Sequence, residues 1–279
     1  MPDTAEELEA LASKYAGDMN KAVRRVIASV GKPRMEKSVK LLESELAEVM
    51  GRAHMAGRVS VLRTVASAAP GVLAAKGIPK TAVAVTRMST RELLRRVPMV
   101  AESAMDVTRL IEQGAFTAAR ASTQSIVQRV QLVIADSLEQ GQPTPDTSAL
   151  LADTEAWSRA YSENVVRTTQ SRAYDDGAVT MTSNPAVRVV VPAFRFDATR
   201  DSNVRPNHWA AHGFIAAVDS PEWLRRGLIP PLGFQCRCVR SFVTRSKLKR
   251  MGLIDKNGRV ITHRPRSINA AGPDQGFTQ

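Results

Sequence analysis

The residues whose types and spacing best suit chemistry lie in and before the stretch IPPLGFQCRC, residues 229–238. Cys236 and Cys238 are the only cysteines in the 279 residues, and one arginine separates them. His208 and His212 are four residues apart, so a helix there would place both imidazoles on one face. Two nitrogens and two sulfurs are the ligand set of a tetrahedral zinc site.

The spacing of the two cysteines leaves three interpretations open. Structural zinc sites usually use Cys-x(2–4)-Cys, whereas Cys-x-Cys in an extended strand points both side chains to one face, which permits joint ligation without favouring it. A redox pair needs a low thiol pKa, which Arg237 and Arg240 would encourage. Packing of both cysteines as small buried hydrophobes needs no partner. The spacing favours packing, and we therefore expect no cofactor, with zinc as the alternative.

A catalytic interpretation of the neighbouring polar residues has less support. Asp197, Asp201 and His208 could form an acid–base or metal-hydrolase site, but these residue types also serve as scaffold groups that bind backbone. No P-loop, Gly-x-Ser-x-Gly or His-Glu-x-x-His motif accompanies them. The prolines before the cysteines predict an extended approach, with Gly233 in a conformation closed to other residues and Phe234 in a core. We expect a structural role and no enzyme.

The elements that must position these residues begin with helices. Apolar residues at helical spacing predict helices over residues 3–28, 35–55 and 148–181. Ser89-Thr-Arg-Glu92 fits a capping box, which would open a further helical stretch that ends near residue 138.

The pattern changes near residue 185, where strand-like sequence begins. VRVVVPAFRFDAT and CVRSFVT alternate and are rich in β-branched and aromatic residues, and Asn257-Gly258 between apolar residues predicts a hairpin. The expected fold class is α+β. The domains predicted are a helical docking region at 1–185, a small basic α+β domain at 186–250, and a hairpin with an extended tail at 251–279.

Positive charge is concentrated in the last third of the chain. The net charge is +12, and residues 186–279 hold 16 Lys and Arg against 6 Asp and Glu. This asymmetry favours a polyanionic partner such as nucleic acid, with a solvated or intersubunit face as the alternative. No apolar run reaches the roughly 18 residues of a membrane-spanning helix, so no membrane partner is expected. The candidate DNA contacts are Arg225, Arg226, Arg240, Arg245, Lys247, Lys249 and Arg250.

Several short motifs follow one another in the second half of the chain: Arg167-Thr168, Phe194-Arg195-Phe196 with Asp201 after it, His208, Gly213, Pro230-Pro231, Gly233, and Cys236-Arg237-Cys238. In this order they resemble the phage Mu protein F-like family, which includes the SPP1-type head morphogenesis proteins. The resemblance covers about residues 150–245, and the tail PDQGF is similar to a segment at the end of some members. Some members have an additional Cys-x-x-Cys after the position of Asp201, where this chain has SNVRPNHW.

The resemblance implies a minor head protein of a phage particle. Its expected partners are the portal protein, the major capsid or scaffolding protein, and double-stranded DNA bound without sequence preference. Its expected location is the capsid interior near the portal vertex, reached from the host cytoplasm, because the N-terminus resembles no secretory signal. Similar domains are joined to toxin modules in some phage proteins, so an enzyme or toxin-type effector is the alternative. A host DNA-binding protein would need base-reading motifs, which the sequence lacks.

Overall fold

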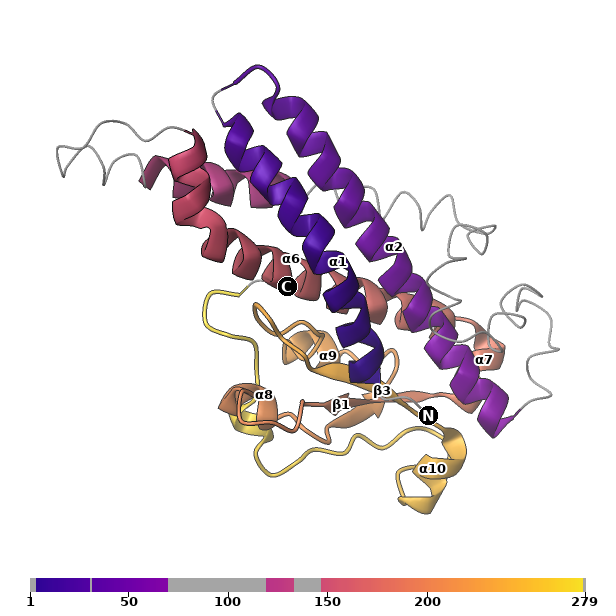
Figure 1. Ribbon diagram of the computed structural model, residues 1–279. Coiled ribbons are helices and arrows are strands. Elements are labelled where there is room, and N and C mark those ends of the chain that lie inside the picture. The colour runs from indigo at the N-terminus through magenta and orange to yellow at the C-terminus, as the bar shows by residue number, and fades with distance from the viewer. Residues whose placement is uncertain (1–3, 31, 70–118, 133–146, 278–279) are drawn as a thin grey trace. The chain divides into compact units, whose positions relative to one another are not determined.

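A computed structural model of the chain describes residues 4–30, 32–69, 119–132 and 147–277 (Figure 1). The chain divides into two compact units: unit 1 is Met1–Leu8, Arg52–Glu102 and Gln170–Gln279, and unit 2 is Glu9–Gly51 and Ser103–Thr169. The predicted capping box at 89–92 lies outside the described residues, whereas residues 119–132 are helical as expected. Among the described helices, none is long and apolar enough to cross a membrane.

Three long helices confirm the predictions from apolar spacing: α1 (Thr4–Ser29), α2 (Met35–Ala68) and α6 (Thr147–Thr182). α2 continues well past the predicted end at residue 55, because Val59, Leu62 and Val65 extend its buried face at helical spacing. Hydrogen bonds tie the helices together within unit 2. Ser158 Oγ on α6 donates to Asn20 Oδ1 on α1 at 3.0 Å.

In unit 1, α2 and α6 approach each other through two glycines. A Cβ built on Gly57 would lie 2.0 Å from the carbonyl oxygen of Tyr174, and one built on Gly177 would lie 1.9 Å from that of His54. No side chain fits at either position without moving a backbone. Beside this contact lies an apolar cluster made of Val61, Leu62, Val65, Ala178, Met181, Val187, Val190 and Val191.

The segment predicted to begin the first strand forms a short helix instead, α7 (Pro185–Val190). The Asn184 side chain accepts a hydrogen bond from Ala186 N at 2.9 Å, and Pro185 occupies the first turn, where its missing N–H costs nothing. The valines at 187 and 190 are buried on one face of this helix. A cap and burial at helical spacing therefore outweigh the β propensity of the valine run.

The two predicted strands are confirmed as neighbours in a three-stranded antiparallel sheet with the order β2-β1-β3, of which Figure 1 labels β1 and β3. The sequence did not predict β2. The strands are β1 (Ala193–Asp197), β2 (Ile215–Ala217) and β3 (Val239–Val243), with Phe194 opposite Ala216 on one side and Phe242 on the other. Phe194 and Phe196 face the larger core with Phe214, Trp223, Leu228, Leu232, Cys236, Cys238 and Ile268. Ala193, Ile215, Val243 and Leu248 form a separate cluster. The fold class is α+β, as predicted.

Short elements complete unit 1: α8 (Pro206–Trp209), α9 (Glu222–Arg225), α10 (Arg245–Arg250) and the 3-10 helix η3 (Ile268–Ala270). The predicted hairpin is present as a single antiparallel bridge between Ile254 and Val260, and Gly258 in its turn has a φ of 76°. The tail is held by contacts. Ile268 is buried in the larger core, and the Phe277 ring packs edge-on against Phe234.

Candidate functional site

His208, Cys236 and Cys238 form a buried cluster within unit 1. His208 lies on α8, and the two cysteines lie in the extended chain directly before β3. Nδ1 of His208 is 3.6 Å from Cys236 Sγ and 3.7 Å from Cys238 Sγ. Each of the three residues is at most 4% exposed. Alternation along the extended chain points both thiols to the same side, as the sequence predicted.

Asp274 in the C-terminal tail holds the other side of the His208 ring. Its Oδ1 is 3.1 Å from His208 Nε2 and accepts a hydrogen bond from Asn207 Nδ2 at 3.3 Å, while Arg205 Nη1 lies 3.1 Å from Oδ2. A carboxylate surrounded by donors accepts rather than donates, so Nε2 of His208 carries the hydrogen. Nδ1 therefore presents its lone pair to the two sulfurs.

The surroundings of the two thiols shift their pKa values in opposite directions. The pKa of Cys236 is lowered, mainly because its sulfur accepts a hydrogen bond from Cys238 and also because the N–H of Leu232 donates to it, although burial opposes the shift. The pKa of Cys238 is raised by its hydrogen bond to Cys236 and by burial, while the N–H of Thr199 donates to its sulfur. Neither Arg237 nor Arg240 is among the main causes of these shifts.

His212 does not join the cluster, so the structure does not bring together the four residues that the sequence offered as the alternative zinc set. α8 ends at Trp209, and His212 follows it in a turn. The His212 ring stacks on Trp209 with centroids 4.9 Å apart, and its Nδ1 accepts a hydrogen bond from Ala198 N at 3.2 Å. The expected i, i+4 alignment fails because the helix is too short to carry both residues.

Gly233 and Phe234 play other roles than those expected. Gly233 has no positive φ; the residue in the left-handed region is Gln235, with a φ of 56°. A Cβ on Gly233 would lie 1.7 Å from Asp274 Oδ2, so this glycine leaves room for the carboxylate that holds His208. Phe234 is 61% exposed instead of buried.

The remaining residues of the resemblance mostly shape loops. Asp201 forms an ion pair with Arg237, whose hydrogen bond lowers the pKa of the exposed Asp201 carboxyl. Gly213 has a φ of 85° in the turn before β2. Pro231 is buried and follows a cis peptide bond, and Arg167 is half-buried on α6.

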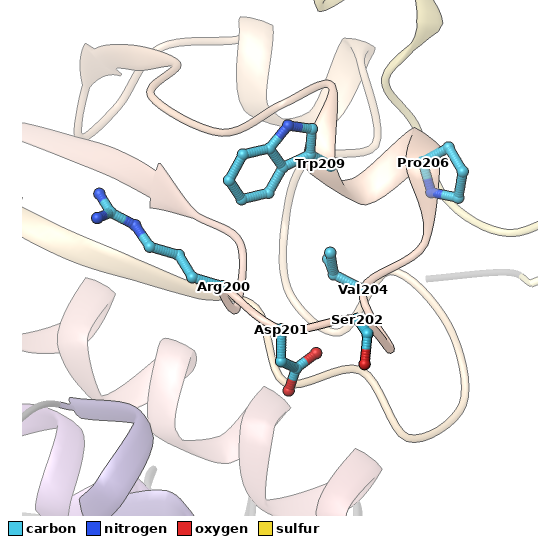
Figure 2. Close-up of a pocket in the computed structure, with 6 residues that line it drawn as sticks. All are labelled: Arg200, Asp201, Ser202, Val204, Pro206 and Trp209. Carbon is cyan, nitrogen blue, oxygen red and sulfur yellow. The ribbon is translucent and has the colours of Figure 1, made fainter.

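An open pocket lies over the loop between β1 and α8. Figure 2 shows Trp209 above the loop and the Asp201 carboxylate below it. Because Asp201 is paired with Arg237, the pocket offers no unpaired carboxylate for acid–base chemistry. The lining residues are Arg200, Asp201, Ser202, Val204, Pro206 and Trp209.

Arg240, predicted as a DNA contact, is a core residue, which corrects that prediction. Its side chain is 4% exposed and forms a bidentate ion pair with Asp175 on α6. Its guanidinium also lies over the ring of Phe194, at 4.7 Å from the centroid, and over that of Trp223, at 5.1 Å. The alternation of β3 turns this arginine inward, where it connects the sheet to α6.

Three other predicted DNA contacts are engaged within the protein. Arg225 and Arg226 both pair with Glu222, which also lies 3.4 Å from Arg264 Nη2. Arg245 donates to the carbonyl oxygens of Val189 and Gly258, both at 3.0 Å. Arg225 stays largely exposed, whereas Arg245 is half-buried and links α10 to the hairpin.

Five exposed cations on α10 and the adjoining hairpin form what we call the basic surface: Lys247, Lys249, Arg250, Lys256 and Arg259. α10 and the hairpin are contiguous, since Leu248 packs with Leu253, Ile254 and Val260. Asp255, the acid nearest in sequence, is occupied by the N–H groups of Asn257 and Arg259. Within the described part of the chain, none of the five cations forms an ion pair.

Sequence reasoning assigned no role to two carboxylates that the fold makes important. Asp274 lies in the PDQGF segment that resembles the end of some family members, and that motif was the available signal. No sequence signal indicated a role for Asp175, because an acidic residue in a long helix is ordinarily exposed to solvent.

Residues 128–241 match the family described as phage Mu protein F like protein, a range that includes the cysteines and His208 but ends before Asp274. No curated protein and no solved structure matches the chain significantly. Proteins of this family are structural phage proteins related to the head. Residues 128–241 of this chain therefore form a phage Mu protein F-like domain.

Proposed function

We propose that this protein is a minor head protein of a phage particle, placed at the interior of the capsid near the portal, where it contacts packaged double-stranded DNA. The family supports the head assignment. The observation that carries the DNA contact is the basic surface, whose five cations are exposed and free of ion pairs among the described residues.

The basic surface suits phosphate rather than base recognition. α10 is six residues long and presents lysines and an arginine, without the aromatic side chains on which single-stranded bases stack. Lysine and arginine that reach phosphates bind any sequence and release counterions. Binding of this kind suits DNA held at high density beside a capsid protein.

The helical region is the proposed docking part for the portal and for the major capsid or scaffolding protein. Residues 1–185 hold 23 Lys and Arg against 21 Asp and Glu, so this region has little net charge for a polyanion. The neutral balance favours contacts with protein over contacts with DNA.

Quantitative mass spectrometry of purified particles tests the location. We expect a few copies of this polypeptide per DNA-filled particle, and the copy number after DNA ejection distinguishes a portal-bound protein from an ejected one. A matched measurement of the major capsid protein sets the scale. Absence of the polypeptide from filled particles would refute the placement inside the head.

A further inference from the structure

The geometry points to a metal site: we propose that His208 Nδ1, Cys236 Sγ and Cys238 Sγ together bind one zinc ion. The three donor atoms lie within 4.8 Å of one another, and all three residues are buried. The inference is independent of the DNA contact proposed above, because it rests on a different part of unit 1. It also replaces the sequence-derived set, since His212 takes no part.

The two nitrogen–sulfur separations fit a tetrahedral ion. Zinc bound at about 2.05 Å to nitrogen and about 2.3 Å to sulfur holds those two atoms about 3.6 Å apart at the tetrahedral angle. The observed separations from His208 Nδ1 are 3.6 Å to one sulfur and 3.7 Å to the other. One lone pair accepts a hydrogen from only one thiol, so hydrogen bonding alone does not explain two sulfurs at nearly equal distance.

The groups around the donors are those that a zinc site uses. Asp274 accepts from His208 Nε2 at 3.1 Å, which fixes the ring with its Nδ1 lone pair toward the sulfurs. The N–H groups of Leu232 and Thr199 donate to Cys236 and Cys238, so each sulfur has a backbone donor that stabilises a thiolate. Two thiolates and an imidazole favour zinc over oxygen-seeking cations such as magnesium.

The burial of the cluster decides between a structural and a reactive role. Cys236 and Cys238 are 4% and 2% exposed, so neither a substrate nor a thiol reagent reaches them in the folded chain. Three protein ligands leave one position of the tetrahedron for a small donor such as water. The bound ion would join α8 to the chain before β3 and, through Asp274, to the tail.

The zinc content of the full-length protein, purified without metal-affinity resin, tests the proposal. We expect one zinc per chain by mass spectrometry of the metal, and less than about a tenth of that in His208→Gln or in Cys236→Ser with Cys238→Ser. His212→Gln is the matched control and retains one zinc. A wild-type protein free of zinc, or loss of zinc in His212→Gln, would overturn the assignment.

A second measurement uses the unmutated chain, so that the test does not depend on variants that fail to fold. Co²⁺ added to protein stripped of metal is expected to produce thiolate charge-transfer and tetrahedral absorption that saturates at one equivalent. Asp274→Asn should then weaken zinc in competition with a chelator by about 10- to 100-fold, as loss of an orienting carboxylate does. Absence of thiolate absorption, or oxidation of the pair to a disulfide under the same conditions, would contradict the metal site.

Discussion

Neutralising two lysines of the basic surface should change how DNA binding responds to salt. Five phosphates contacted by Lys247, Lys249, Arg250, Lys256 and Arg259 correspond to a slope of log K against log salt of about −4.5, because each neutralised phosphate contributes about −0.9. Between 50 and 200 mM salt this slope reduces the affinity about 500-fold. Lys247→Gln with Lys249→Gln removes two contacts, so the slope should become about −2.7 and the loss about 40-fold.

Fluorescence anisotropy with a labelled duplex and the full chain, measured over that salt range, gives the slope directly. Lys21→Gln with Lys40→Gln is the matched control, because both lysines are exposed and pair with carboxylates 2.9 and 3.0 Å away on their own helices. This control changes the net charge equally and should leave the slope unchanged. A flat salt response would refute the electrostatic account, and equal slopes in the two double variants would show that binding follows net charge instead of the basic surface.

Two further predictions concern the helices. Gly177→Ala should lower the free energy of unfolding, measured by urea denaturation, by about 1–3 kcal/mol or more, because its Cβ would overlap the carbonyl of His54. The control Gly17→Ala has nothing within 4 Å of its Cβ and should raise the free energy of unfolding by about 0.5–1 kcal/mol. Equal effects of the two substitutions would contradict the close helix contact. His54 has its pKa lowered from 6.5 to about 4, mainly by burial and then by Arg58, so its folded state resists protonation. Because the unfolded chain takes up this proton more readily, the free energy of unfolding is highest above pH 6.5. It falls by about 3 kcal/mol in all as the pH is lowered toward 4. The difference in pH dependence between wild type and His54→Gln, followed by urea midpoints, measures this effect, and parallel pH curves would contradict it.

The long helices and two of the three strands could be predicted because their signals are local, whereas β2 was not predicted. Apolar residues at helical spacing located α1, α2 and α6, and alternation located β1 and β3. The valines at 187–191 misled the strand prediction, because a cap at Asn184 and a proline in the first turn acted on the same residues. The cap before the segment favoured a helix, although the β propensity of the valines favoured a strand.

The candidate sites depended on contacts between distant parts of the chain, and those only the tertiary structure decided. The sequence placed His208 and the two cysteines among the residues of interest, but the partner of His208 lies in the tail and His212 turns away. Net charge likewise identified the basic part of the chain, yet Arg240 is buried against Asp175 while Lys247 and Lys249 remain exposed. Residue type and spacing set which chemistry is possible locally, whereas burial and pairing, which select among the candidates, arise from segments far apart in sequence.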